Sequence, residues 1–538
     1  MNAEVASIKS RVKAADDAWV AAKQPIVVGK DVLELLSSSM YVDAMSIFRE
    51  YVQNAADAID QRRAAGRSKL TGQMEIRIDP NERRLVIRDN GTGIRASEFT
   101  SRLMNLGASA KRGTQARGFR GVGRLAGLGY CQELIFRSQA EGEATTSEMR
   151  WDCRRLRTLL RAAEHDKDIT SVIRDVVTVR EVPSGKADHF LEVELNGVVR
   201  HNNDRLLNVD AVGDYLAQVA PVPFSPDFSH GADIAAWLLA RGFSAPIEIR
   251  INDATDPIYR PHRDEFDQGN GSPQITISKL EFHDLPGVDG ETAAIAWIAH
   301  HEYAGALPNS AGIKGLRVRS GNIQVGDHNL FEDLFPEVRF NSWCVGEVHV
   351  LDRKLIPNGR RDHFEQSVHF ENLQNQLAPV VREVARLCRH SSVSRKWIKT
   401  FDLHRLSALE RARVVERGGV ARSVAHLQAN AAKTSLKAMH RVVEQKYLTE
   451  EIRRSMAAEA SRVENRVLKM IKGAEGERNP LSHYKPAVRR AYEHVISMIY
   501  NHVKNRAAAG ALVEKILSRL EADASSASAP KKKTRRKK

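Results

Sequence analysis

The most constraining feature of this 538-residue chain is the stretch of residues 49–60, which reads R-E-Y-V-Q-N-A-A-D-A-I-D. Its spacing of apolar and polar residues predicts an amphipathic helix with Glu50, Asn54 and Asp57 on one polar face. A carboxylate that can polarise water, beside an amide oxygen that can bind magnesium, is typical of nucleotide hydrolysis. A solvated acidic helix shows the same pattern, so this helix alone does not decide the function.

A second motif ends the strand-like residues 74–94, whose apolar and polar residues alternate on either side of a Pro-Asn turn. This alternation predicts a β-hairpin, and the hairpin ends in Asp89-x-Gly91-x-Gly93. Glycines directly after a strand let the backbone approach a flat ligand. A buried aspartate there can accept a hydrogen bond from an exocyclic amine.

A third motif, Gly118-Phe-Arg-Gly121-Val-Gly123, precedes an apolar stretch at residues 125–128 that can begin a helix. Glycine-rich turns at the start of a helix expose unpaired N–H groups to phosphate oxygens. A plain turn explains one such motif equally well. All three motifs, however, occur in order within residues 49–123, and together they indicate a nucleotide-binding domain.

The set of motifs resembles the GHKL ATPase superfamily, which includes gyrase, MutL, histidine kinases and the heat shock protein 90 chaperones. The likeness is strongest to the chaperones (bacterial HtpG and its relatives), because residues 48–58 match their first motif and residues 105–114 match their lid-hinge segment. The resemblance implies a Bergerat α/β sandwich over residues 1–215. No GxxxxGK[ST] sequence occurs, so a P-loop is not the source of nucleotide binding.

The resemblance also implies roles for single residues. Glu50 activates the attacking water, Asn54 binds magnesium, and Asp89 reads the adenine of ATP. The other nucleotide-binding residues that it implies are Asp57, Gly91, Gly93, Asn105, Lys111, Gly118, Gly121 and Gly123.

Residues 227–395 mix strand-like runs with helices and are predicted to form an α/β middle domain. A strand-like run at residues 346–352 leads to the loop N-G-R-R at residues 358–361, which resembles a middle-domain loop of the same chaperones. The arginine of that loop reaches the γ-phosphate of the nucleotide. The match gives this role to Arg361, with Arg360 a close rival. The alternative is that both arginines only form salt bridges at the protein surface.

The C-terminal part changes character. Residues 400–521 are rich in Ala, Arg, Glu and Leu, and their three-to-four-residue apolar spacing predicts a helical domain. This domain does not resemble the chaperones' dimerisation domain, although a helical bundle can form a homodimer or bind a partner. Residues 522–538 predict a disordered basic tail that either binds nucleic acid or serves as a solubilising end. The predicted fold class is α+β.

Composition restricts the setting of the protein. The net charge is +15, of which the basic run at residues 531–538 supplies seven charges. Four scattered cysteines without a CxxC pair indicate reduced thiols, and no apolar run is long enough to span a membrane. We expect a cytoplasmic protein without a signal peptide.

Three functions remain open. The leading one is an ATP-binding, magnesium-dependent, ATP-hydrolysing conformational clamp of the heat shock protein 90 type, acting on a protein client. The alternative is a nucleic-acid-associated GHKL clamp of the MutL or MORC type, which the basic tail favours; the third is a nucleotide-binding scaffold with little hydrolysis. The arginine loop favours the first, although Lys314 lies where other superfamily members carry a catalytic lysine. Histidine kinases lack the hydrolytic carboxylate that Glu50 provides.

Overall fold

The structure is a computed structural model of the chain, and it divides the chain into two compact units. The first unit covers Met1–His301 and Ala306–Arg382, and the second covers Glu302–Gly305 and Glu383–Lys538. The residues that the structure describes are 43–66, 70–105, 123–161, 169–185, 189–200, 202–267, 274–476, 480–503 and 505–527.

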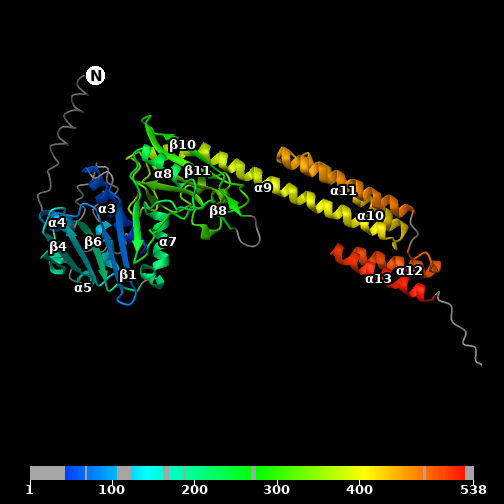
Figure 1. The fold of residues 1–538 in the computed structure, drawn as a ribbon, viewed down its shortest axis with the longest axis horizontal. Helices are drawn as coiled ribbons and strands as arrows, with labels where there is room; N and C mark the ends of the chain where they lie inside the picture. The colour runs from blue at the N-terminus through cyan, green and yellow to red at the C-terminus, as the bar shows by residue number, and fades with distance from the viewer. Residues whose placement is uncertain are drawn as a thin grey trace, which may run out of the picture. The chain divides into compact units, whose positions relative to one another are not determined.

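Within the described part of the first unit, seven strands form a sheet in the order β5-β4-β3-β6-β2-β1-β7 (Figure 1). Their bounds are β1 (Gly72–Asp79), β2 (Arg84–Asp89), β3 (Glu133–Gln139), β4 (Thr145–Asp152), β5 (Val177–Pro183), β6 (Phe190–Asn196) and β7 (Ile247–Ile251). The predicted hairpin is confirmed, because β1 and β2 pair antiparallel with Met74 opposite Asp89. Side chains of β1 alternate strictly between buried and exposed, so one face of this strand meets the core.

The edge strand β7 corrects one expectation. Sequence analysis grouped residues 247–251 with the second region, but β7 pairs in parallel with β1, with Gly72 opposite Ile247. Its isoleucines are buried in the same core as Ile59 of the first motif. Five alternating residues reveal a strand but not its pairing partner, since pairing is set by tertiary packing.

Helices cover this sheet. Helix α3 (Ser46–Ala64) buries Phe48, Val52 and Ile59 in the core of the sheet and contains no glycine or proline that would interrupt it. The apolar stretch after the third motif forms a short 3-10 helix, η2 (Gly123–Gly129), which packs against α3. The remaining helical elements of this part are α4 (Ala96–Met104), α5 (Cys153–Arg161), α6 (Ile169–Val176), η3 (Asn202–Leu207) and α7 (Val209–Val219).

Apart from β7, the chain after α7 builds a second sheet, in which five described strands follow the order β10-β11-β14-β12-β13, and β8 and β9 pair separately. The elements here are α8 (Gly231–Ala240), β8 (Glu265–Phe266), β9 (Ile275–Thr276), β10 (Lys279–Pro286), β11 (Thr292–His300), η4 (Asn309–Ala311), β12 (Gly315–Ser320), β13 (Ile323–Val325), η5 (Glu332–Leu334), η6 (Val338–Trp343) and β14 (Val345–Val350). Strands β12 and β13 form a hairpin, and β12 pairs in parallel with β14. This mixture of strands and helices confirms the α+β fold class.

A buried charge network joins the end of α7 to the second sheet. The carboxylate of Glu347 accepts hydrogen bonds from Arg260 at 2.5 Å and from Arg319 at 2.6 Å. Arg319 also donates to the backbone carbonyls of Gln218 and Ala220. Burial would raise the pKa of Glu347, but the two guanidinium groups outweigh burial and hold this pKa well below its usual value. The network therefore fixes the segment that links the two sheets.

The second unit is helical, as predicted (Figure 1). Its helices are α9 (Val368–Arg417), which begins in the first unit, and α10 (Arg422–Val443), α11 (Glu450–Gly476), α12 (Pro486–His502) and α13 (Arg506–Ala527). Phe401 of α9, Leu436 of α10 and Val467 of α11 share one apolar core, and α12 and α13 contribute to another. None of the described helices is both long enough and apolar enough to cross a membrane.

The predicted tail begins inside a helix. Helix α13 continues to Ala527, so it includes the first six residues of the segment that was expected to be disordered. Alanine has the highest helix propensity, and this segment is rich in alanine. Residues 528–538, with the basic run, lie outside the described residues.

Candidate functional site

Helix α3 carries three polar residues of the first motif. Glu50 and Asp57 are buried and Asn54 is half-buried, although all three are polar. Carboxylates are rarely this buried unless they have partners or a function. The polar face of α3 is therefore a candidate functional site.

The structure brings the predicted base and the predicted cation together. Arg361 Nε lies 3.4 Å from Glu50 Oε1, although the two residues are 311 positions apart in the chain. Their side chains are only 10% and 11% exposed, respectively. A salt bridge between two surface residues, the plain alternative for Arg361, does not describe this buried pair.

The loop that carries Arg361 is closed by its own backbone. The N–H of Arg361 donates to the carbonyl of Asn358 at 3.1 Å, and the N–H of Asn358 donates to His363 at 2.8 Å. The carbonyl of Arg361 accepts from the N–H of Gly326 at 2.8 Å. Arg361 has a φ of 56°, which is uncommon for a residue with a side chain. Such strained backbone persists where the surroundings over-determine it, and it often occurs at functional sites.

Arg49 connects α3 to the same loop, and sequence analysis gave it no role. Its Nη2 donates to the backbone carbonyl of Arg360 at 2.7 Å, while the Arg360 side chain is exposed. Burial raises the pKa of nearby Tyr215 to about 12, and the positive charge of Arg49 opposes this rise. The signal available in the sequence was an arginine directly before Glu50 in a helix whose neighbouring positions are apolar.

The other end of α3 is held by the residues that lead into β7. Ser244 Oγ donates to Asp60 Oδ2 at 2.7 Å. Arg63 donates to the backbone carbonyls of Ala245 at 2.9 Å and Pro246 at 3.1 Å. The helix that bears Glu50 is thus anchored at both ends by residues that come after the first sheet's β6.

Asp89 lies at the end of β2, where the second motif was expected to meet a ligand. It is buried, and its Oδ1 accepts the N–H of Gly91 at 2.8 Å. Burial raises the pKa of Asp89 to about 7, although the Gly91 hydrogen bond and Arg88 both oppose this rise. A carboxyl group with so raised a pKa is a frequent mark of a functional site.

Three of the predicted glycines lie where a side chain would not fit. A Cβ at Gly91 would lie 2.5 Å from the Ala58 Cβ of α3. Gly93 has a φ of 64°, and its Cβ would collide with the carbonyl of a β3 residue. A Cβ at Gly123 would collide with the carboxylate of Glu50. The backbone at these three positions therefore comes closer to α3 and β3 than any other residue would allow.

Ser138 on β3 is a further residue that sequence analysis missed. Its hydroxyl accepts the N–H of Ile94 at 2.8 Å and donates to the carbonyl of Phe190 on β6 at 2.8 Å. These two bonds hold the second motif against the central strands of the sheet. A serine within a strand-like run carries no distinguishing signal of such a role.

The remaining predicted residues give less information. Asn105 ends α4, is exposed, and accepts a hydrogen bond from Arg124 through its carbonyl. Lys314 donates to the side chain of Asn309. Three predicted residues lie outside the described residues: Lys111, Gly118 and Gly121.

The chemistry of the donor set fits a magnesium nucleotide. Within the described residues, no group of three or more His, Cys, Asp and Glu could hold a metal ion without further ligands. Magnesium commonly takes one or two protein oxygens and completes its shell with phosphate oxygens and water. The amide oxygen of Asn54, one helical turn from Glu50, is a suitable protein ligand of this kind.

A comparison with protein families defines the class of this domain. Residues 43–172 match the family model described as "Histidine kinase-, DNA gyrase B-, and HSP90-like ATPase". This range contains all three motifs: α3 and the first hairpin carry the first two, and Gly123, the last residue of the third, begins η2. The GHKL resemblance drawn from those motifs is therefore confirmed for this part of the chain.

Within that class, the chain is similar to bacterial proteins named "Chaperone protein HtpG". The protein from Sodalis glossinidius (strain morsitans) is 26% identical over 203 residues, which cover 33% of this chain and 31% of the relative. The protein from Baumannia cicadellinicola subsp. Homalodisca coagulata is 30% identical over 145 residues, which cover 23% and 22%. That from Serratia proteamaculans (strain 568) is 29% identical over 145 residues, covering 23% of each chain. The chain thus spans less than a third of these relatives' length.

Proposed function

We propose that this chain is a magnesium-dependent ATPase that works as a conformational clamp of the heat shock protein 90 type. The observation that carries the proposal is the 3.4 Å contact between Arg361 and Glu50. It supports a site with a general base from the first sheet domain and a cation from the second region. The family match at residues 43–172 supports ATP as the nucleotide.

In the proposed site, Asp89 accepts a hydrogen bond from the exocyclic amine of adenine. The backbone at Gly91, Gly93 and Gly123 lies close to the nucleotide, because these positions carry no side chain. Asn54 holds magnesium, which when bound offsets negative charge on the phosphate oxygens. Asp57, on the same face of α3 as Asn54, contributes to the polar wall of the site.

The proposed reaction is an in-line attack of water on the γ-phosphorus, with ADP as the leaving group. Glu50 takes the proton from the attacking water, while Arg361 stabilises charge on the transferred phosphoryl group. While Arg361 faces Glu50, the carboxylate is neutralised by its partner. The γ-phosphate, which is more highly charged, competes for the guanidinium and frees Glu50 to act as the base. Base activation then depends on a bound triphosphate.

The clamp is the arrangement that brings the second region to the base. Arg49 holds the Arg361 loop, so the end of α3 that carries Glu50 engages this region. By similarity to the HtpG chaperones we propose a protein client and a homodimer. We propose a cytoplasmic location, which the four buried cysteines, none of them in a disulfide, support.

Phosphate release by the purified full chain, with ATP affinity measured by calorimetry, tests the proposal. We expect magnesium-dependent turnover that Glu50→Gln abolishes while ATP still binds, because the base acts on water and not on the nucleotide. Gln keeps the size and hydrogen bonding of the side chain and removes only its basicity. Wild-type turnover in Glu50→Gln would show that the base lies elsewhere, and a failure to bind ATP would reject the nucleotide site altogether.

A further inference from the structure

Charge is divided unevenly along the chain. Residues 1–382 hold 47 Lys and Arg against 52 Asp and Glu, a net charge of −5. Residues 383–527 hold 28 against 15, a net charge of +13 within 145 residues. The terminal basic run at residues 531–538 adds +7. The positive charge of the protein therefore belongs to its helical unit and tail, and most of it does not come from the tail.

Helix α10 concentrates this charge on one face. Its 22 residues include no Asp or Glu. Lys433, Lys437 and Arg441 follow one another at four-residue spacing and are all exposed, and Arg422 is exposed at the start of the same helix. The opposite face of α10 is buried in the apolar core that it shares with α9 and α11. The four cations span about 28 Å along the helix axis, and together we call them the α10 stripe.

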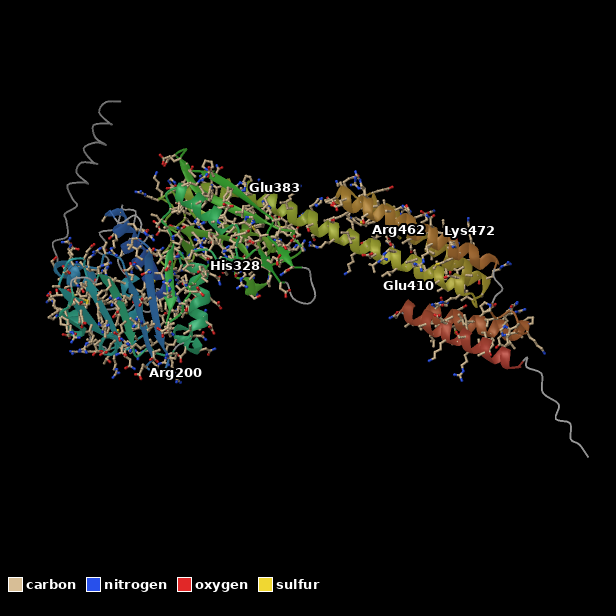
Figure 2. The ribbon with its side chains drawn as sticks, in the orientation of Figure 1. Arg200, His328, Glu383, Glu410, Arg462 and Lys472 are labelled. Carbon is tan, nitrogen blue, oxygen red and sulfur yellow. The ribbon has the colours of Figure 1, made fainter. Side chains whose placement is uncertain are left out.

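Three arginines of the neighbouring helices each pair with a glutamate on their own helix. On α9, Arg386 pairs with Glu383 at 2.6 Å, and on α11 Arg453 pairs with Glu450 at 3.0 Å and Arg462 with Glu459 at 2.9 Å. Figure 2 labels Arg462 on α11, where it projects from the helix as an exposed side chain. Such pairs within one helix neutralise charge locally. Helix α10 has no acidic residue that could neutralise the α10 stripe in this way. His440 of α10 contacts Glu464 of α11, but His440 is not part of the stripe.

We infer that the helical unit binds duplex nucleic acid through its phosphate backbone, and that the α10 stripe makes the central contacts. A net charge of +13 on a small helical unit is the electrostatic footprint of a polyanion-binding protein. Proteins that bind single strands stack the bases on exposed aromatic rings. Within the described residues of 383–527, no Phe, Trp or Tyr side chain is exposed, so the surface suits a paired duplex and not splayed bases.

This inference goes beyond the proposed ATPase. The helical unit would place the clamp on a nucleic acid without reading its sequence, since phosphate contacts position a protein but carry no sequence information. The predicted nucleic-acid contact was limited to the terminal tail, whereas the α10 stripe puts contacts on a folded surface.

The test compares two triple variants of the full chain that each lose three positive charges. One variant carries Lys433→Gln, Lys437→Gln and Arg441→Gln in the stripe. The matched control carries Arg386→Gln, Arg453→Gln and Arg462→Gln, whose charges are already paired. Both keep the terminal basic run, so its contribution cancels. Fluorescence anisotropy with a labelled 30-base-pair DNA duplex gives the affinity between 50 and 200 mM salt, and circular dichroism checks that both variants fold.

We expect the stripe variant to lose roughly tenfold or more in affinity, with the slope of log K against log salt falling by about one for each lost phosphate contact. The control should change by no more than roughly threefold, and neither variant should change ATP turnover. Competition by duplex RNA equal to that by duplex DNA supports backbone recognition of both. Equal losses in the two variants, tighter binding of a single strand, or equal competition by polyglutamate would each overturn the inference.

Discussion

Arg361, on a loop after β14, and Glu50, on helix α3, form an ion pair with Nε 3.4 Å from Oε1. The guanidinium at this distance is the charge partner of the carboxylate within the buried site. The same guanidinium is the group that would stabilise a γ-phosphate. One contact thus joins the two charges whose separation the proposed reaction requires.

Arg361→Ala should lower kcat for ATP hydrolysis by about a hundredfold, because removal of one preorganised transition-state contact typically costs that much. KM for ATP should change little. Arg360→Ala should remain close to wild type, since the Arg360 side chain is exposed and alanine keeps the carbonyl that Arg49 contacts. Steady-state phosphate release over a range of ATP concentrations measures both parameters.

A larger loss in Arg360→Ala than in Arg361→Ala would mean that the loop acts in a register one residue away. Full activity in both variants would place the catalytic cation elsewhere, and Lys314→Ala would then be the next variant to measure.

Arg49 should act as a positioning residue for the Arg361 loop. Arg49→Ala removes the 2.7 Å bond to the Arg360 carbonyl, and we expect kcat to fall roughly tenfold to a hundredfold because a small misplacement of a catalytic group is costly. ATP affinity should be nearly unchanged. Arg49→Lys keeps a donor on a long side chain and should recover part of the rate. A loss of ATP affinity equal to the loss of kcat would assign Arg49 to nucleotide binding.

Asp89 should make nucleotide binding depend on pH near neutrality. Its pKa of about 7 means that the carboxylate, the form that best accepts the adenine amine, is lost as pH falls below that value. ATP affinity measured by calorimetry should therefore decrease between pH 8 and pH 6. Asp89→Asn should bind roughly tenfold to a hundredfold more weakly at pH 8, as expected for a lost charged hydrogen bond, and its affinity should not vary with pH.

The same residue should cost stability when no nucleotide is bound. The folded state raises the pKa of Asp89 from 3.8 to about 7, so it favours the protonated form. The associated stabilisation is complete below pH 3.8 and is lost as pH rises towards 7. At pH 8, Asp89→Asn should raise the thermal unfolding midpoint while it weakens ATP binding. A lower midpoint in that variant would contradict the burial argument.

Local sequence patterns predicted the parts of the site that are local. The helix of Glu50 and the hairpin that ends at Asp89 each depend on spacing within a short segment, and the structure forms both. The contact of Arg49 with Arg360 and the pairing of β7 with β1 join segments far apart, and no pattern within either segment encodes them. Since β7 completes the first sheet, a chain truncated near residue 215 would lack an edge strand. Single substitutions therefore test the dependence of Glu50 on the Arg361 loop better than such a truncation does.

The buried network around Glu347 was not predicted, because most of its contacts also join segments that are far apart in the chain. His349 lies two residues from Glu347 on β14, but Arg260 and Arg319 come from two other segments, and each looks like an ordinary polar residue in its own run. Only the fold brings the two arginines to the carboxylate of Glu347. Removal of one charged partner from such a network typically lowers the free energy of unfolding by about 3–5 kcal/mol, because the remaining charge stays buried.

His349 gives this network a pH signature. Burial lowers the pKa of His349 to about 4, although the Glu347 carboxylate, which accepts its hydrogen bond at 3.1 Å, opposes this decrease. The folded state therefore favours neutral His349. As pH falls below 6.5, the ordinary pKa of histidine, His349 takes up a proton in the unfolded chain, whereas in the folded chain it stays neutral until about pH 4. Stability should be lost across this window, by at most about 1.4 kcal/mol per pH unit for one histidine.

We expect His349→Gln to unfold with a weaker pH dependence than the wild type between pH 6.5 and pH 4, because glutamine has no proton to take up. Denaturant unfolding at several pH values measures the difference. Asp89 acts in the opposite sense over the same window, since its raised pKa stabilises the protein as pH falls. The two chains share Asp89, so its contribution cancels when their curves are subtracted. If the difference in unfolding free energy between wild type and His349→Gln did not change between pH 6.5 and pH 4, His349 would be equally charged in the folded and unfolded states. The carboxylate of Glu347 would then keep His349 protonated in the folded protein.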